Sequence, residues 1–436
     1  MSCENTCRSR SMLFYLMLAL SATAFVGRAA AAEQRATPKS HDDGAWKKLF
    51  DGKNLDGWTN PYDWGKAWAE DGEIRLQAGK KFFLLTAKKY RDFIFEAEVK
   101  MPKGKANSGF MFRCHQKPNR VWGYQAEVDP SDRQWSGGLY DEGRRGWLHP
   151  RKGDPAAGKT FVKKTKGAFS RNDWNRYRIH CVGPSIRIYV NGVLTTDYVD
   201  TTDREGYIAL QHHGEEGQIY QFRNIRIRKL RSPKALAATM HNLPLVFFED
   251  FESGAGRWTQ TDAAAWKVTE EDGNHVYALH KQSGYKPPVR SPVNIARIKD
   301  VNVSDFVLQV RMKQTGREYG HRDMCLFFGY QDPSHFYYVH IATRADAHAN
   351  SIFIVNGEPR VSIAQHRTDG TDWATGYHDV RIIRDASSGS IKVFFDDMAE
   401  PIMWTVDKTF LSGKIGLGSF DDTGNMDDVM IWGTAK

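Results

Sequence analysis

Several polar residues of this sequence fall on alternate positions of short apolar segments, where they could move protons and hold hydroxyl groups. In a half-buried strand, alternate side chains share a face. In residues 123–129 the apolar side chains therefore take one face and leave Gln125, Glu127 and Asp129 on the other. The same alternation in three further segments completes an open face that carries Arg113, Gln125, Glu127, Asp129, Tyr140, Gln211 and His213. A carboxylate, an imidazole, a phenol and amides can bind hydroxyl groups and transfer protons, although the outer face of a sandwich sheet is often polar without any function.

A glycine-rich segment, residues 135–148, could form a rim over this face. Its glycines permit a tight loop, and Trp135 and Trp147 offer flat rings for stacking. Glu142 and Arg144 add charge. We expect this loop to contact a ligand; the alternative is a surface loop held by an internal ion pair.

Short strands are the elements that must position these residues. From Trp46 onward, apolar runs such as 93–99, 186–190 and 225–227 alternate with turn residues, and long helical periods are absent. Asn191-Gly192 directly after a strand is a hairpin signal. Regular strands with frequent turns predict an all-β sandwich fold.

The strand pattern occurs twice along the 436 residues, a length that suggests two or three domains. It breaks at 231–244, which we interpret as a linker, and restarts in the same order. The echoes pair Leu49–Trp58 with Phe248–Trp258, Phe93–Met101 with Phe306–Met312, Gly206–Leu210 with Gly413–Leu417, and Phe222–Ile227 with Asp427–Trp432. We therefore predict a polar leader at 33–43 and two tandem β-sandwiches at 44–230 and 245–436.

The first 32 residues have the features of a signal peptide. Arg8 and Arg10 precede an apolar run, Met12 to Val26, and small residues at 30–32 offer a cleavage site before Glu33. The alternative is a membrane anchor, but the run is short for a span of ~20 residues. We expect an exported protein, periplasmic or extracellular, with no integral membrane segment after cleavage.

Charge and cysteine content restrict the partners. The chain has 61 Lys and Arg against 52 Asp and Glu, without the dense basic block typical of a nucleic-acid-binding protein. We expect a carbohydrate or glycan partner and no nucleic acid.

Outside the signal segment, Cys114, Cys181 and Cys325 fit no zinc motif. We expect buried thiols, with a disulfide between Cys114 and Cys181 as the alternative.

A series of short motifs resembles the 3-keto-disaccharide hydrolase family over residues 46–230. Its members, in order, are Phe50–Trp58, Asn107–Gly109, Gly123–Glu127, Ser136–Tyr140, Asp173–Asn175 and Phe222–Ile225. The resemblance implies a concanavalin-like jelly roll and action on glycosides oxidised at C3. The second half resembles only the broader laminin-G or glucanase-like group.

The implied substrate suggests roles for the open face. A ketone at C3 acidifies the C2 hydrogen, so a base can remove it and the C1 substituent can leave; water can then add back to give net hydrolysis. We expect Glu127 and His213 as base and acid in either order, with Arg113 and Tyr140 stabilising the enolate. The amides of Gln125 and Gln211, with Asp129, would hold substrate hydroxyls, as would Glu142, Arg144, Trp135 and Trp147 of the rim.

Two alternatives remain open at this point. Glu127 and Asp129 could act as the carboxylate pair of a conventional glycosidase. The protein could instead be a non-catalytic carbohydrate-binding or adhesion protein at the cell surface.

The second half lacks the proposed catalytic pair. Glu127 aligns with His340, and Gln211 and His213 align with Gly418 and Phe420, so we expect no equivalent reaction there. Tyr337, Tyr338 and Phe420 would form either a stacking surface for glycans or internal packing.

Four acids at the two ends of the second half raise the question of a structural Ca²⁺, an ion that favours oxygen ligands. They are Glu249, Asp250, Asp427 and Asp428, and the alternative is that they are unpaired surface acids. We expect no other cofactor, and no metal at the candidate site of the first half.

Overall fold

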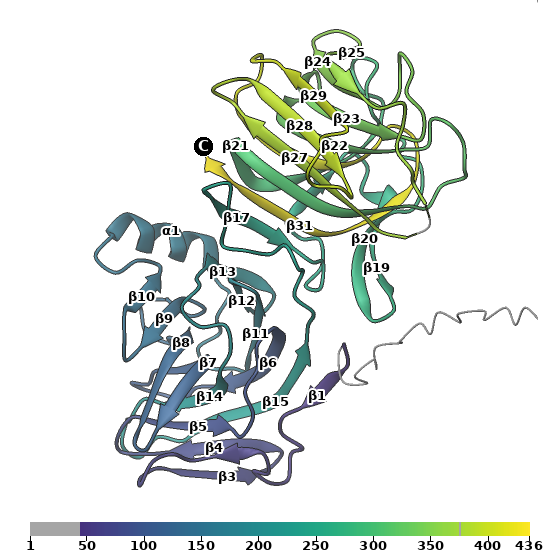
Figure 1. The fold of residues 1–436 in the computed structure, drawn as a ribbon. Coiled ribbons are helices and arrows are strands. Elements are labelled where there is room, and N and C mark those ends of the chain that lie inside the picture. The colour runs from purple at the N-terminus through teal and green to yellow at the C-terminus, as the bar shows by residue number, and fades with distance from the viewer. Residues whose placement is uncertain (1–43, 375) are drawn as a thin grey trace, which may run out of the picture. The chain divides into compact units, whose positions relative to one another are not determined.

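The computed structural model describes residues 44–374 and 376–436, and it is nearly all β (Figure 1). The signal peptide and polar leader predicted at 1–43 lie outside the described residues. The one α-helix among them is α1 (Pro155–Thr165), which is capped by Asp154 through hydrogen bonds from the amides of Ala156 and Ala157. No helix in the described part of the chain is long and apolar enough to span a bilayer.

The first fifteen strands form two antiparallel sheets. One sheet has the order β13-β12-β11-β6-β15-β4-β3, with β1 paired to β15, and the other has the order β10-β9-β8-β7-β14-β5-β2. The first sheet consists of β1 (Trp46–Lys48), β3 (Lys66–Glu70), β4 (Glu73–Gln77), β6 (Phe93–Lys100), β11 (Asn175–Val182), β12 (Ser185–Val190), β13 (Val193–Val199) and β15 (Tyr220–Lys229). The second consists of β2 (Trp58–Thr59), β5 (Phe82–Thr86), β7 (Ser108–Lys117), β8 (Arg120–Val128), β9 (Leu139–Glu142), β10 (Gly146–His149) and β14 (Tyr207–His212).

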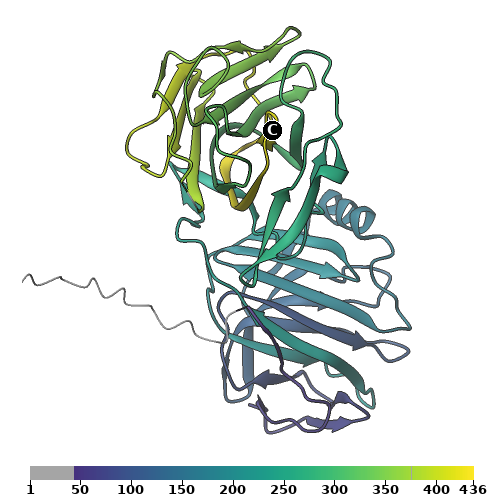
Figure 2. The same cartoon turned by 90° about the vertical axis from the view of Figure 1, so that its right-hand side faces the viewer.

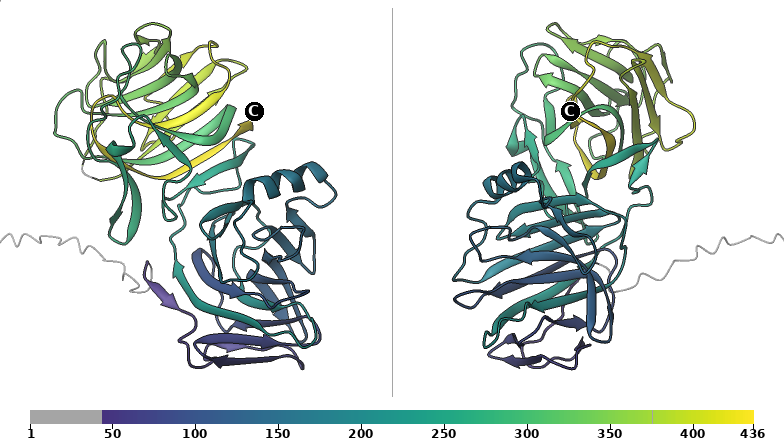
Figure 3. Two further views of the ribbon diagram at one scale, coloured as in Figure 1. Left: turned by 180° about the vertical axis from the view of Figure 1, so that it is seen from behind. Right: turned by 90° about the vertical axis from the view of Figure 1, so that its left-hand side faces the viewer.

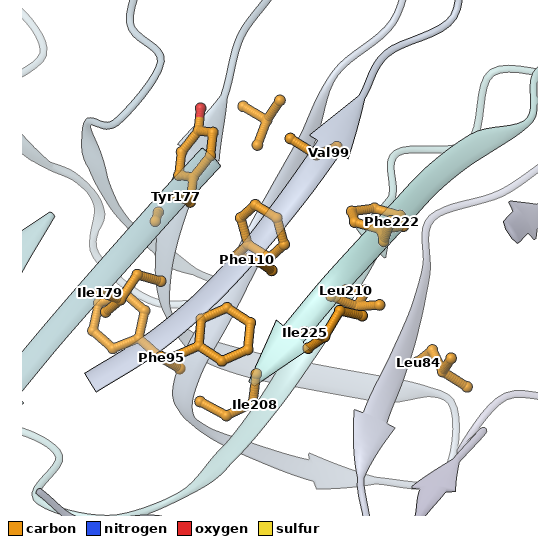
Figure 4. Packing of buried hydrophobic residues seen from close by; sticks show 14 of the residues in the cluster. Leu84, Phe95, Val99, Phe110, Tyr177, Ile179, Ile208, Leu210, Phe222 and Ile225 are labelled. Carbon is orange, nitrogen blue, oxygen red and sulfur yellow. The ribbon is translucent and has the colours of Figure 1, made fainter. Parts of the chain in front are cut away.

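The core of this first sandwich lies between the two sheets, as Figure 4 shows for its centre. Phe110 of β7 faces the other sheet, with ring centroids 5.7 Å from Phe95, 5.1 Å from Tyr177 and 5.7 Å from Phe222. Burying one such side chain is worth about 1.5–3 kcal/mol. Because alternate residues of β8 point into this core, the polar residues between them are fixed on the opposite face.

The remaining strands form one continuous curled sheet that folds back on itself. They are β16 (Thr239–Met240), β17 (Leu243–Glu249), β18 (Trp258–Gln260), β19 (Trp266–Glu271), β20 (Asn274–Leu279), β21 (Asn294–Gln314), β22 (Asp323–Asp332), β23 (His335–Ala342), β24 (Ser351–Asn356), β25 (Val361–Ser362), β26 (His366–Arg367), β27 (His378–Asp385), β28 (Ser390–Phe395), β29 (Met403–Val406), β30 (Gly413–Ser419) and β31 (Gly424–Ala435), with a 3₁₀ turn at Ala263–Ala265. The first part of β21 pairs with β30 and its second part with β27 and β31. The long strand therefore takes part in both layers, and Figures 2 and 3 show β21 beside β31 from further sides. Leu326 of β22 and Ile382 of β27 belong to the core that the layers enclose.

All three described cysteines, Cys114, Cys181 and Cys325, are buried free thiols. The alternative of a Cys114–Cys181 disulfide is therefore wrong, and the expectation of buried thiols is confirmed. Burial raises the pKa of the Cys181 thiol to about 12, which keeps this side chain protonated and unreactive at neutral pH.

Candidate functional site

A cleft of about 330 Å³ lies on the outer face of the sheet that contains β7, β8, β9 and β14. It brings together eight of the predicted site residues, namely Gln125, Glu127, Asp129, Tyr140, Glu142, Trp147, Gln211 and His213. The other lining residues are Lys81, Lys105, Ala106, Asn107, Ser131, Arg133 and Glu215. Acids, bases and amides thus line one hollow above an antiparallel sheet.

Glu127 is the buried carboxylate of this cleft, with 4% of its surface exposed. Its Oε1 accepts hydrogen bonds from Asn107 Nδ2 at 2.7 Å and Arg133 at 3.2 Å, and its Oε2 accepts one from Gln125 Nε2 at 3.0 Å. Burial raises the pKa of Glu127, and these three donors oppose the rise. The result is a fixed carboxylate that is more basic than one in water.

The floor of the cleft depends on a glycine. Gly109 of β7 pairs with Glu127 of β8, and the Gln125 side chain lies over Gly109 so closely that a Cβ there would be 2.3 Å from Gln125 Cδ. The Oε1 atoms of Gln125 and of Gln211 are buried and have no hydrogen-bond partner. Buried acceptors of this kind need a donor, which a bound water or a ligand hydroxyl can supply.

His213 stands across the cleft from this floor, directly after β14. Its Nδ1 lies 2.9 Å from Glu215 Oε1, and the other oxygen of Glu215 accepts a hydrogen bond from Tyr220 at 2.5 Å. Although burial raises the pKa of Glu215, the bonds from Tyr220 and His213 lower it overall, so Glu215 stays ionised. A carboxylate on Nδ1 orients the imidazole and leaves its Nε2 available to the cleft.

Asp129, the carboxylate directly after β8, is fully engaged in local contacts. It accepts hydrogen bonds from Ser131, from Trp135 N and from Arg133 Nε at 2.7 Å. Arg133 also contacts Glu127, so one guanidinium links both carboxylates. This arrangement suits Asp129 to holding Arg133 in place rather than to transferring protons.

Tyr140 and Lys81 are further polar residues that line the cleft. Burial, and then the charge of Glu142, raises the pKa of Tyr140, so its phenol keeps its proton as a hydrogen-bond donor. Lys81 Nζ pairs with Glu142 at 3.0 Å, and the Trp147 ring lies edge-on to Tyr140 at 5.2 Å.

The prediction for Arg113 is wrong. The pairing of β7 with β8 shifts register between Phe112 and His115, and Arg113 has a positive φ of 44°. This β-bulge breaks the alternation and buries the guanidinium completely, 3.0 Å from Asp92. Arg113 is therefore a structural residue outside the cleft.

Two residues of the predicted rim also lie outside the cleft lining. Arg144 pairs with Asp141 and Asp203, which is the internal ion pair considered as the alternative for this loop. Trp135 packs edge-on against Trp147 at 4.7 Å and lines a separate hollow beside α1. Of the rim residues, Glu142 and Trp147 reach the cleft.

A second hollow, of about 380 Å³, lies on the outer face of the other sheet of this sandwich. Its central acid, Glu96, is paired with Arg176, Arg178 and Arg226. Because these bonds hold the acid as a carboxylate and lower its pKa despite burial, this hollow is a weaker candidate for proton transfer than the cleft.

The second sandwich places other residues at the equivalent positions. Cys325 pairs with His340 and with Gly418, whereas Gly109 pairs with Glu127. Tyr338 is buried in a small cluster with Phe327 and Phe353, separate from the main core of the second sandwich. Tyr337, on the opposite face of the same strand, is buried in that core. The prediction that both tyrosines form a stacking surface is therefore wrong, and the alternative of internal packing is confirmed.

The four acids considered for Ca²⁺ are paired with arginines. Arg187 contacts Glu249 at 2.8 Å and Asp250 at 2.9 Å, and Arg311 contacts Asp427 and Asp428. Within the described ranges, the group of three acids with oxygen atoms close enough for one ion is a different one, Asp323, Asp421 and Asp422.

The segment that forms the cleft matches a known protein family. Residues 45–228 match the 3-keto-alpha-glucoside-1,2-lyase-like domain. The matched lyase-like domain contains the whole cleft, from Lys81 to Glu215, and it confirms the resemblance found in the sequence motifs. None of the curated proteins matches the chain.

Solved structures similar to the chain include carbohydrate-binding proteins. The module CBM66 of Bacillus subtilis is 16% identical, covering 42% of this chain and 100% of its own, with a TM-score of 0.30. Lectin I-B4 of Griffonia simplicifolia is 14% identical over 43% of this chain and 98% of its own, with a TM-score of 0.31. The CBM22-1-CBM22-2 tandem of Paenibacillus barcinonensis Xyn10C is 10% identical over 90% of this chain and 97% of its own, with a TM-score of 0.32.

Proposed function

We propose that the lyase-like domain cleaves glycosides oxidised to a ketone at C3, with Glu127 as the base. The observation that carries the proposal is a buried carboxylate of raised pKa in a cleft lined by amides and an oriented histidine. A carboxylate made more basic by burial is better matched to removing a carbon-bound proton near neutral pH. The family description of the matched segment supports the same reaction class.

In this mechanism Glu127 takes the proton from C2, which the neighbouring ketone acidifies. The electrons of that bond first form an enolate with its charge on the C3 oxygen, and they then form the C1–C2 double bond as the C3 carbonyl is restored and the C1–oxygen bond breaks. His213, held at Nδ1 by Glu215, donates a proton to the leaving oxygen. The charge that develops on the C3 oxygen needs donors, and Tyr140, Lys81 and Arg133 are the donors that line the cleft.

Product analysis tests the reaction. Incubation with 3-keto-trehalose and 3-keto-lactose should release the C1 substituent and a sugar whose C1–C2 double bond is conjugated to the ketone, seen by ultraviolet absorption and mass spectrometry. If water then adds back, the product gains the mass of one water. Binding of glycans without turnover of either substrate would refute the proposal in favour of a carbohydrate-binding protein.

The variant Glu127→Gln tests the assigned base. We expect kcat to fall about 10²–10⁴-fold, the usual contribution of a general base. Glu98→Gln is the matched control, because Glu98 makes an ion pair with Arg223 on the other sheet and should keep wild-type kcat. Full activity of Glu127→Gln would rule out this assignment.

We also propose that the chain is exported, on the strength of its first 32 residues. Amino-terminal sequencing of the protein recovered from its native cell should begin at Glu33. A start at Met1 would contradict export by cleavage.

A further inference from the structure

Three acids of the second sandwich lie close together, and none of them lines the candidate cleft. Asp323 is the first residue of β22, and Asp421 and Asp422 follow β30 in the turn before β31. Carboxylate oxygens of the three residues lie within 4.8 Å of one another. Two oxygens bound to one Ca²⁺ at 2.3–2.6 Å are at most about 5 Å apart, so this spacing fits a single ion.

Asp323 has an oxygen atom without any partner. The residue is fully buried. Its Oδ2 accepts hydrogen bonds from Phe420 N at 2.8 Å and from Cys325 Sγ at 3.1 Å, whereas its Oδ1 is buried and unpaired. A buried carboxylate oxygen is costly unless a hydrogen bond or a cation satisfies it.

The cluster also lacks the basic partner that the other buried acids have. In the described part of the chain, ten of the twelve buried Asp and Glu residues lie within 4.0 Å of an arginine nitrogen. Asp323 and Asp422 are the two that do not. Asp422 instead accepts hydrogen bonds from Tyr319 at 2.7 Å and from Asp323 N at 3.0 Å, which neutralise no charge.

A buried histidine lies beside the cluster. His340 is 4% exposed, its Nε2 lies 3.7 Å from Asp323 Oδ2, and its Nδ1 has no hydrogen-bond partner. An imidazole nitrogen is a common metal ligand, so His340 could add a nitrogen donor to the carboxylates.

Arg360 is a positive group near the cluster. Its guanidinium lies over the rings of Phe420 and Phe353 and donates to Tyr338 OH at 2.8 Å. Engaged in this way, it makes no ion pair with Asp323, Asp421 or Asp422.

We propose that Asp323, Asp421 and Asp422 bind a divalent cation, with Ca²⁺ the first choice because the donors are carboxylate oxygens. The ion would join the turn after β30 to the beginning of β22. This proposal does not depend on the activity of the first sandwich. It places the cation at residues other than the arginine-paired acids that the sequence pattern suggested.

The test measures binding to the full chain after chelation and dialysis. Calorimetric titration with Ca²⁺ should give one site per chain, and Ca²⁺ at a hundredfold excess over Kd should raise Tm by about 5–10 °C. Asp323→Asn and Asp421→Asn should each weaken binding by at least about tenfold. Asp421 is exposed, so its substitution leaves the buried packing intact if Asp323→Asn folds poorly.

The matched control is Asp300→Asn, which changes an exposed acid of β21 and should bind Ca²⁺ like the wild type. Titrations with Mn²⁺ and Zn²⁺ test the role of the histidine: tighter binding of these ions, lost in His340→Ala, would support the same site with nitrogen as a further ligand. Absence of binding for all three ions, or binding that neither aspartate variant weakens, would overturn the proposal.

Discussion

Replacing Gly109 with alanine should shift the pH dependence of the proposed reaction and leave the proposed catalytic residues, Glu127 and His213, unchanged. An alanine Cβ would lie 2.3 Å from Cδ and 2.4 Å from Cγ of Gln125, whereas carbon atoms in contact sit about 3.5–4.0 Å apart. The Gln125 side chain must therefore move by more than about 1 Å. Its 3.0 Å hydrogen bond to Glu127 Oε2 cannot survive such a movement.

The size of the effect follows from that bond. A hydrogen bond to a charged group is worth about 1.5–3 kcal/mol, and one pKa unit corresponds to 1.36 kcal/mol. The bond stabilises the ionised carboxylate, so its loss raises the pKa of Glu127 further. The acid limb of kcat/KM should move to higher pH by about 1–2 units, with a cost in stability of about 1–3 kcal/mol from overpacking.

The assay is the pH profile of 3-keto-glucoside turnover, supported by an NMR titration of the Glu127 carboxyl group that needs no activity. Gly256→Ala is the control, because a Cβ at Gly256 meets no atom within 4 Å and its φ is not positive. A folded Gly109→Ala protein with an unchanged acid limb and an unchanged titration of Glu127 would refute this account of the cleft floor.

Two further predictions concern buried groups outside the cleft. Arg113→Met should destabilise the fold by about 3–5 kcal/mol in urea denaturation, because it removes the buried partner of Asp92 and leaves only the exposed Arg91 at 3.7 Å. Its kcat should remain that of the wild type, and a loss of kcat in the folded variant would instead place Arg113 at the site. In the intact protein, Cys114, Cys181 and Cys325 should react with a thiol reagent at least about a hundredfold more slowly than in denaturant, because burial raises their pKa values. Rapid labelling of the folded protein would contradict this.

Strand alternation predicted the part of the site that lies on regular strands. The core positions of β8 identified Gln125 and Glu127 on the opposite face, and the same rule identified Tyr140 and Gln211. Strand alternation failed at Arg113, because a β-bulge changes the face on which a residue lies. The residue types of that segment do not indicate a bulge.

The residues that sequence reasoning missed come from loops. Asn107, Arg133 and Glu215 all contact Glu127 or His213, but the alternation of strands says nothing about residues before or after them. Asn107 belonged to one of the family motifs, so a signal was present for it. Arg133 and Glu215 are placed by tertiary contacts across the sheet, which a single sequence does not reveal.

The pairing of the long strand β21 determines when the second sandwich can form. Val303 near its middle pairs with Ala435, and Leu308 pairs with Ile431, so its partner is the last strand of the chain. Contacts this distant in sequence form late and slowly. During synthesis the pairing of β21 with β31 must wait until residues 424–435 leave the ribosome, although β18 and β27 can pair with β21 earlier. The first sandwich has all its strands by Lys229. This second half is therefore the part whose nascent chain most needs protection from aggregation.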